Sequence, residues 1–521
     1  MAGSEIILST LNAKYIHAAF GLRYLMANLG TLQSRAEIVE FEISQRTFPI
    51  VEQLLARQPK IIGFGVYIWN VAQTLSIVKC LKQLAPEIQI VLGGPEVSYE
   101  IEGQEIASYA DVLITGEADL TFAATCREIL ENGSASQAMV RSPVPDLADL
   151  ALPYGLYTED DIQNRIVYVE ASRGCPFTCE FCLSSLNVPV RQVPERAFLE
   201  SLEFLYQQGV QHFKFVDRTF NLNLKSSRAI LEFFLERLRP GLFLHFEMIP
   251  DRLPEGLREI IARFPEGVLQ FEVGIQTFDE ATAKNISRRQ NYEKLADNFA
   301  YLRGHTGVYI HADLIVGLPG EDLTSFGRGF DRLIALNPQE IQVGILKRLR
   351  GTPIVRHDEA WEMVYDGDPP YEILQNRLID FQSMQRMRRF ARYWDLVGNS
   401  GNFVETVPLI WDGGASAFVS FLSFSDWIYR EAKRRHGIAL TKLVGFVFRF
   451  LTEIRKLDPK RVTAIMWRDY QRAGRSDYPM ELRPYLDLET PVGRTRRGAS
   501  GLKRQSRHLA VSPTAPLPNK G

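Results

Sequence analysis

Short apolar runs alternate with longer amphipathic stretches over the first 120 residues of the chain. Residues 71–85, for example, carry apolar side chains at helical spacing between two apolar runs. Because strand-like and helical patterns alternate, the sequence predicts a parallel, doubly wound α/β sheet that binds its ligand at the carboxyl ends of the strands. Five runs have the length and composition of strands: residues 5–11, 36–43, 60–68, 88–94 and 111–117.

Glycines stand at the ends of two of these predicted strands. Gly93 and Gly94 end the fourth strand, and Gly116, followed by Glu117, ends the fifth. Glycine lets the backbone approach a large ligand closely, although the same residues could simply make tight turns between strand and helix. The pattern predicts a domain over residues 1–140 with a candidate ligand site at these four residues.

A second series of strands follows a short irregular stretch. Residues 141–164 contain three prolines and little periodicity, which predicts an interdomain linker. Six strand-like runs then lie within residues 165–350, and each of the first five precedes a helical candidate. This order predicts a partial (β/α)6 barrel, smaller than the eightfold form. The six runs are residues 166–172, 212–220, 242–249, 268–277, 308–319 and 340–349.

The pattern becomes helical and aromatic after the barrel. Residues 351–490 predict a helical C-terminal domain that could cover a substrate at the barrel mouth, although its aromatic side chains are more typical of a core. From residue 491 onward there are seven Lys or Arg residues and no acids, with many Ser, Pro and Gly. This composition predicts a disordered basic tail over residues 491–521.

Charge and cysteine content narrow the class of function. Lys and Arg total 60 against 62 for Asp and Glu, so no strong field favours nucleic acid or an anionic membrane. Without a leader-like or membrane-spanning stretch, the chain is expected in the cytoplasm, acting on a small molecule or a peptide. Five cysteines make no disulfide framework, and Cys80 and Cys126 have the helical, apolar surroundings of small buried residues.

The other three cysteines lie within eight residues. Cys175, Cys179 and Cys182 have the spacing C-x3-C-x2-C directly after the first predicted barrel strand. Thiolates are soft ligands suited to iron–sulfur clusters, and a cubane held by three of them keeps one iron open to another ligand. Zinc is the alternative. It normally takes four ligands, and His212 could supply the fourth through folding.

This spacing, with Phe181 before the last cysteine, resembles the radical S-adenosylmethionine (SAM) superfamily over about residues 165–350. The resemblance implies a 4Fe-4S cluster that binds SAM and splits it reductively to methionine and a 5'-deoxyadenosyl radical. It also implies an electron donor such as flavodoxin or ferredoxin. The barrel would then shield the radical from solvent.

Residues at later strand ends extend the resemblance. They are similar in identity and spacing to SAM contacts of oxygen-independent coproporphyrinogen oxidase and its relatives. The resemblance implies that Arg288 pairs with the methionine carboxylate, and that Glu247 and Asp313 accept hydrogen bonds from amino or hydroxyl groups. Asp217 stands where the family usually has a glutamate for the methionine amine. No residue is assigned to catalysis, and the implied SAM contacts are Phe181, Asp217, Glu247, Gln276, Arg288 and Asp313.

A doubly wound domain before such a barrel resembles the cobalamin-binding branch of the superfamily. The resemblance implies cobalamin contacts at Gly93, Gly94, Gly116 and Glu117. The better-known signature D-x-H-x-x-G is broken around His17, so this histidine is not expected to bind cobalt, and the lower base of cobalamin would be displaced.

These resemblances predict a cobalamin-dependent radical SAM enzyme that modifies an unactivated carbon by methyl transfer or by an oxidative or cyclising step. Two alternatives stay open. One is a radical SAM enzyme that does not use cobalamin. The other is a cluster-bearing electron-transfer or sensor protein without turnover.

Overall fold

The computed structural model describes residues 4–186, 189–414, 416–472, 475, 477–486 and 504–509. The chain forms two compact units. The first contains residues 1–218 together with 347–356 and 365–372, and the second contains residues 219–346, 357–364 and 373–521. The division falls at Arg218, well beyond the predicted linker.

The first unit contains a six-stranded parallel sheet in the order β2-β1-β3-β4-β5-β6. This order confirms the predicted doubly wound topology. The sixth strand was not predicted, because its three residues are largely exposed and show no apolar pattern. The strands are β1 (Ile6–Asn12), β2 (Ala36–Glu42), β3 (Ile61–Gly65), β4 (Gln89–Gly93), β5 (Val112–Thr115) and β6 (Met139–Arg141).

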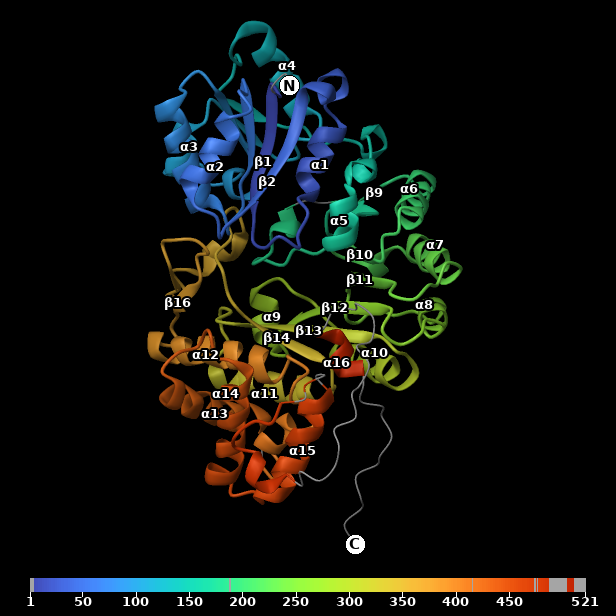
Figure 1. Cartoon of the computed structure of the whole chain (residues 1–521), viewed down its shortest axis with the longest axis vertical. Helices are drawn as coiled ribbons and strands as arrows, with labels where there is room; N and C mark the ends of the chain where they lie inside the picture. The colour runs from blue at the N-terminus through green and yellow to red at the C-terminus, as the bar shows by residue number, and fades with distance from the viewer. Residues whose placement is uncertain are drawn as a thin grey trace. The chain divides into compact units, whose positions relative to one another are not determined.

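Helices cover both faces of this sheet (Figure 1). Because successive side chains of a strand point to opposite faces, Ile7 of β1 packs in the core beside α2 and α3, whereas Leu8 packs in the core beside α1 and α4. The sheet is therefore buried on both sides, and only the ends of its strands are left for a ligand. The helices are α1 (Phe20–Ala27), α2 (Thr47–Leu55), α3 (Val71–Leu84) and α4 (Thr121–Asn132).

The predicted linker contains a helix, α5 (Glu159–Asn164). Thr158 and Asp161 form a capping box in which each side chain accepts a hydrogen bond from the backbone N–H of the other. Asp161 is also 2% exposed and held by ion pairs, so this end of the linker is part of the first unit's core.

A second parallel sheet has the order β14-β13-β12-β11-β10-β7, which confirms the predicted six-stranded α/β architecture. Strands β7 and β10 belong to the first unit, and β11–β14 belong to the second. The strands are β7 (Val167–Val169), β10 (His212–Phe215), β11 (Phe243–Met248), β12 (Leu269–Gln276), β13 (Tyr309–Val316) and β14 (Glu340–Ile345). The helices between them are α6 (Glu195–Gln207), α7 (Leu224–Leu235), α8 (Glu255–Ile261), α9 (Glu280–Asn285), α10 (Tyr292–His305) and α11 (Leu323–Ala335).

The remainder of the second unit is mainly helical, as predicted. Its aromatic side chains form a core: the rings of Phe330 and Phe390 meet Trp394 with centroids 4.8 and 6.3 Å away. Among the described residues, no helix is both long and apolar enough to cross a membrane. Its elements are β16 (Ile373–Gln375), α12 (Phe381–Val397), α13 (Ala417–Ala432), α14 (Leu440–Arg449) and α15 (Pro459–Arg472), and β15 (Val364–Tyr365) has one residue in each unit.

Part of the predicted disordered tail is ordered. Gln505–Leu509 forms the helix α16, whereas residues 491–503 and 510–521 lie outside the described residues. Arg504 lies 2.9 Å from carboxylate oxygens of both Glu340 and Asp395, and His508 lies 3.0 Å from the carbonyl oxygen of Asn399. The prediction of disorder over this short segment is wrong, because acceptors elsewhere in the second unit hold a stretch that has no apolar pattern of its own.

Candidate cofactor-binding sites

The three clustered cysteines lie in a loop closed by a short antiparallel ladder. Strand β8 (Ser172–Arg173) enters the loop and β9 (Arg191–Gln192) leaves it, with Ser172 paired to Gln192 and Arg173 to Arg191. Cys175 and Cys179 are buried and Cys182 is half-buried. We call residues 174–190 the cluster loop.

The cysteines influence one another electrostatically. Burial raises the pKa of the Cys175 thiol, and the neighbouring sulfurs of Cys182 and Cys179 raise it further. In the described part of the chain, no three His, Cys, Asp or Glu side chains are arranged to hold a single metal ion. In a cubane each thiolate binds a different iron, so three sheltered, mutually close soft donors fit a 4Fe-4S cluster.

Two buried carboxylates fix the course of this loop. Asp217 accepts hydrogen bonds from the backbone N–H of Ala171 at 3.0 Å and from the hydroxyl of Ser172 at 2.5 Å. Burial raises the pKa of Asp217 to about 7. Glu180 pairs with Arg356, and the backbone N–H of Ile354 donates to its carbonyl oxygen at 3.0 Å. Asp217 therefore pins the entry to the loop, while its contact with SAM stays a prediction, as does that of half-buried Phe181.

A cavity of about 310 Å³ opens at the carboxyl ends of the strands in the first sheet. Its wall includes all four residues that the sequence singled out as candidate cobalamin contacts: Gly93, Gly94, Gly116 and Glu117. Other parts of the wall come from α1, from β3, β4 and β5, from the start of α4, and from Glu170 and Arg173. The structure thus places the predicted residues around one hollow, as expected for a doubly wound sheet.

The cavity wall requires glycine at Gly94. Its φ of +111° is rarely adopted by other residues, and a Cβ here would lie 2.5 Å from the carbonyl oxygen of Val66. Gly63 has a similar constraint, since a Cβ would lie 2.7 Å from the ring of Phe122. The Val66 backbone and the Phe122 ring therefore leave no space for a side chain at these two positions of the wall.

Charged groups line one side of the same cavity. Arg173 donates to Glu170 at 2.8 Å, to Asp119 at 2.9 and 3.1 Å and to Glu117 at 3.0 Å, and its guanidinium lies 4.4 Å from the Tyr24 ring centroid. Burial raises the pKa values of Glu170 and Tyr24. Sequence reasoning missed this cluster, although the acids that follow Gly116 and the arginine before Cys175 were visible signals.

An aromatic pair lies beside the cavity. Tyr67 lines it, and the ring of Trp69 stacks on Tyr67 with centroids 4.4 Å apart and planes 7° apart. The indole N–H of Trp69 donates to the carbonyl oxygen of Leu11 at 3.1 Å, yet this residue remains 48% exposed. An exposed ring held in a fixed orientation is a surface on which a planar ligand could rest.

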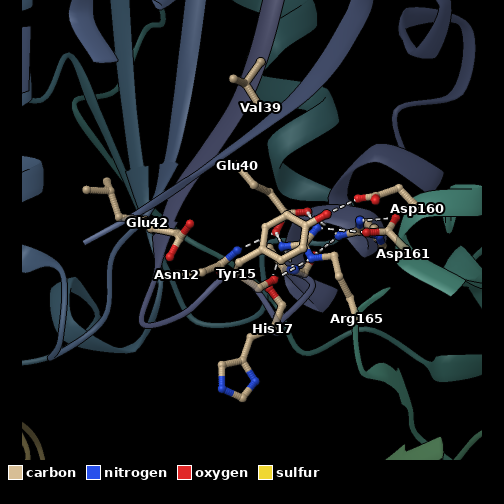
Figure 2. A network of polar contacts seen from close by, with 12 residues as sticks. Asn12, Tyr15, His17, Val39, Glu40, Glu42, Asp160, Asp161 and Arg165 are labelled. Atoms are coloured by element: carbon tan, nitrogen blue, oxygen red, sulfur yellow. Dashed lines mark hydrogen bonds and ion pairs between the residues drawn. The ribbon is translucent and has the colours of Figure 1, made fainter. Parts of the chain in front are cut away.

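His17 lies near a buried charge network (Figure 2). The network joins Glu40 and Asp161 to Arg23 and Arg165 at distances between 2.7 and 3.1 Å. The His17 ring points away from it, and its Nδ1 lies 2.6 Å from the hydroxyl of Tyr168. Burial lowers the pKa of His17. The prediction that His17 does not bind cobalt stays a prediction.

In the second unit, alternate positions of three strands are polar. Strands β11 and β12 align His245 with Gln270 and Glu247 with Glu272, and β13 aligns His311 with Glu272. The intervening positions are apolar and mostly buried. One face of these strands is therefore a polar surface, which is unusual for a parallel sheet and typical of a ligand site.

Gln276 and Arg288 lie close to each other at the end of β12, and their contact with SAM stays a prediction. Gln276 ends β12 at an irregularity with a φ of +73°, a strained conformation that is common at functional sites. Arg288 donates to the carbonyl oxygens of Gly274 and Ile275, the latter at 3.2 Å. A Cβ on Gly274 would lie 2.5 Å from the Gln276 side chain and 3.7 Å from that of Arg288, so this glycine leaves room for both.

Asp313 is half-buried and lies beside a histidine that the sequence did not single out. His311 lies 3.3 Å from an oxygen of Asp313 and 3.4 Å from one of Glu340. Burial acts to lower the pKa of His311, but the two carboxylates outweigh it and raise the pKa to about 10. The Asp313 oxygen nearest His311 has no hydrogen bond of good geometry, which leaves a buried acceptor for a ligand.

Three family models match this chain. The radical SAM superfamily model matches residues 169–331, which contain the cluster loop and the polar strands, and the B12 binding domain model matches residues 7–125, which contain the cavity glycines. Residues 169–331 are thus similar to a radical SAM domain, and residues 7–125 are similar to a B12 binding domain. A radical SAM domain implies a 4Fe-4S cluster and SAM as cofactors, and a B12 binding domain implies cobalamin. A third model, described as a protein of unknown function (DUF4080), matches residues 359–484.

Curated relatives include methyltransferases. An uncharacterised methyltransferase of Pyrococcus horikoshii is 28% identical over 236 residues, which are 40% of this chain and 50% of that protein. The cobalamin-dependent radical SAM methyltransferase TokK of Streptomyces tokunonensis is 24% identical over 339 residues, which are 57% of this chain and 48% of that protein. The chain thus spans about half the length of the curated relatives that it matches.

Solved structures share the fold. The cobalamin-dependent SAM radical enzyme OxsB, solved with aqua-cobalamin and SAM, has a TM-score of 0.59 at 12% identity. The match covers 92% of this chain and 83% of the OxsB chain. The radical SAM methyltransferase TsrM from Kitasatospora setae has a TM-score of 0.55 at 15% identity. The match covers 73% of this chain and 80% of the TsrM chain.

Proposed function

We propose that this radical SAM protein is a cobalamin-dependent methyltransferase acting on an unactivated carbon of a small molecule or peptide. The observation that carries the proposal is that one compact unit contains both the loop with three sheltered cysteines and the glycine-walled cavity. Methyl transfer is favoured over cyclisation because two of the relatives described above are named methyltransferases. An electron donor such as flavodoxin or ferredoxin would reduce its cluster.

The chain's own residues would have separate tasks. Cys175, Cys179 and Cys182 would hold the cluster, and the cavity, which is small for a whole corrin, would take the nucleotide tail of cobalamin between its glycines. Arg288 and Gln276 would hold the methionine end of SAM. When bound, the cluster would supply an electron to SAM and cobalamin would supply the methyl group. The polar strand face would orient the cosubstrate through hydrogen bonds.

Cluster content tests the cysteine assignment. Anaerobically reconstituted protein should contain about four irons per chain, and replacing any one of Cys175, Cys179 or Cys182 with Ala should remove most of them. The controls Cys80→Ala and Cys126→Ala should retain the iron. If these controls lost as much iron as the three variants, the cluster assignment would be overturned.

Cosubstrate cleavage tests the SAM assignment and separates an enzyme from a sensor. With dithionite, the wild type should release 5'-deoxyadenosine, and Arg288→Ala should weaken SAM binding by about 1.5–3 kcal/mol, the usual effect of a hydrogen bond to a charged group. Arg289→Ala is the matched control, because that neighbouring side chain is exposed. Unchanged SAM binding in Arg288→Ala would show that Arg288 does not pair with the methionine carboxylate.

The reaction type has its own test. A methyltransferase should form S-adenosylhomocysteine from SAM only when hydroxocobalamin is added, under reducing conditions. An enzyme that performs a cyclising step has no need of that product. This second candidate has one observation in its favour, 21% identity over 309 residues to an anaerobic magnesium-protoporphyrin IX monomethyl ester cyclase of Cereibacter sphaeroides. Absence of S-adenosylhomocysteine while 5'-deoxyadenosine still forms would favour it.

A further inference from the structure

Both ends of the cluster loop are held by the carboxyl end of strand β5. Arg173 precedes Cys175 by two residues and Arg191 follows the loop, and both donate to the carboxylate of Glu117. Asp119, two residues further along, accepts two hydrogen bonds from Arg173 at 2.9 and 3.1 Å. The segment that ends β5 therefore holds the two arginines that bracket the loop.

These ion pairs are sheltered from solvent. The side chains of Arg173, Arg191 and Glu117 are 14%, 18% and 19% exposed, and that of Asp119 is 7% exposed. Burial acts to raise the pKa of Glu117, but the hydrogen bonds from Arg191 and Arg173 outweigh it, so the pKa is lowered. Removing one member would leave partly buried charges without their partners, which is costly. The ladder that closes the loop has only two residue pairs, so these ion pairs are a large part of what fixes its ends.

The same residues face the cavity. Glu117, Asp119 and Arg173 all belong to its wall, together with Glu170, which receives a third hydrogen bond from Arg173 at 2.8 Å. A ligand in the cavity would thus lie against Arg173, the residue directly before the cluster loop. Lysine could not replace Arg173, because a single ammonium group lacks the planar fork that reaches three carboxylates.

We propose that Glu117 and Asp119 are positioning residues that couple occupancy of the cavity to the conformation of the cluster loop through Arg173 and Arg191. This inference rests on the proposed function. It also assigns to Glu117 a task other than contact with cobalamin: its carboxylate orients the two arginines. Occupancy of the cavity would hold Arg173 in place and so make the cysteine loop more rigid.

The test uses full-length, anaerobically reconstituted protein and hydroxocobalamin as the probe, with hydrogen exchange measured by mass spectrometry. Exchange in peptides covering residues 172–186 should slow when hydroxocobalamin is added to the wild type. In Glu117→Gln the same peptides should exchange roughly tenfold faster and should no longer respond to hydroxocobalamin. Glu37→Gln is the control, since it replaces another ion-paired acid of the same unit, which contacts Arg57 and not the arginines of the loop, and it should keep the response.

A second readout separates this inference from the proposed function. The electron paramagnetic resonance spectrum of the reduced cluster is recorded without cobalamin. It should differ from the wild-type spectrum in Glu117→Gln, and also in Asp119→Asn and in Arg173→Lys. If an absorbance titration shows no hydroxocobalamin binding by the wild type, the cobalamin part of the proposed function fails, and a changed spectrum still supports positioning. Wild-type exchange and a wild-type spectrum in Glu117→Gln would overturn the inference.

Discussion

His311 is a charged residue in a buried setting, and its stabilising effect depends on pH. Because its folded-state pKa is raised to about 10, the folded protein keeps a proton that the unfolded chain releases near its ordinary pKa of 6.5. Its contribution to stability is therefore complete below pH 6.5 and lost as the pH rises through about 10. We expect the unfolding free energy to fall by about 1.4 kcal/mol per pH unit from this group between pH 7 and 10.

Denaturant titrations at several pH values measure this effect. The difference between wild type and His311→Gln isolates it, because other groups titrate in both proteins. That difference should shrink as the pH rises toward 10. A difference that stayed constant across this range would mean that His311 is not protonated in the folded protein.

Gly94 illustrates how a single backbone conformation shapes the cavity. Gly94→Ala combines an unfavourable positive φ with a Cβ placed 2.5 Å from a backbone oxygen, so a strand end must move. Gly103→Ala is the control, since Gly103 has a φ of +81° but nothing within 4 Å of its Cβ position. We expect Gly103→Ala to cost about 1 kcal/mol of stability and leave hydroxocobalamin binding intact, whereas Gly94→Ala weakens both. Equal effects of the two variants in a binding titration would contradict this.

At the scale of elements, buried ion pairs attach α5 to the first sheet. Glu40 of β2 accepts hydrogen bonds from Arg23 of α1 and from Arg165, the residue after α5. Glu40→Ala would leave both cations without this partner and should lower the unfolding free energy by about 3–5 kcal/mol. Glu37 lies on the same strand as Glu40 and is a more exposed partner of Arg57. Glu37→Ala should lower the unfolding free energy by at most about 1 kcal/mol. Chemical denaturation of the two variants tests the contrast, and similar losses would rule out a special role for the buried network.

Strand and helix positions could be predicted from the sequence because apolar periodicity reports burial directly. Both sheets apart from β6, the cluster loop and the glycines at the strand ends follow from local pattern alone. Polar partners could not be found in this way. The ion pairs of Arg173 with Glu117 join residues 56 positions apart, and nothing in the local sequence specifies which acid an arginine meets. His311 and Glu272 escaped notice for a similar reason, since a polar residue within a strand points to a site only once the neighbouring strands are aligned.

At the scale of the whole molecule, the C-terminal segment contributes to stability. Arg504 meets Glu340, whose side chain is 5% exposed, and Gln505 donates to Gln270 at 3.1 Å. A chain ending at Leu486 should therefore melt a few degrees below the full-length protein, because it loses these contacts and leaves a buried acid with fewer partners. A chain ending at Leu509 is the control and should melt like the full-length protein. Equal melting temperatures in differential scanning calorimetry for both truncations would show that α16 does not stabilise the fold.

The sequence of the cluster loop has a practical consequence for handling the protein. Residues 174–190 contain no Lys or Arg, whereas Arg173 and Arg191 stand at either end and take part in ion pairs. Trypsin thus has no site within the loop, but chymotrypsin can attack Phe177, which is 38% exposed. Comparing digestion by the two proteases should reveal loops opened by loss of iron in air, and so grade preparations before any spectroscopy is attempted.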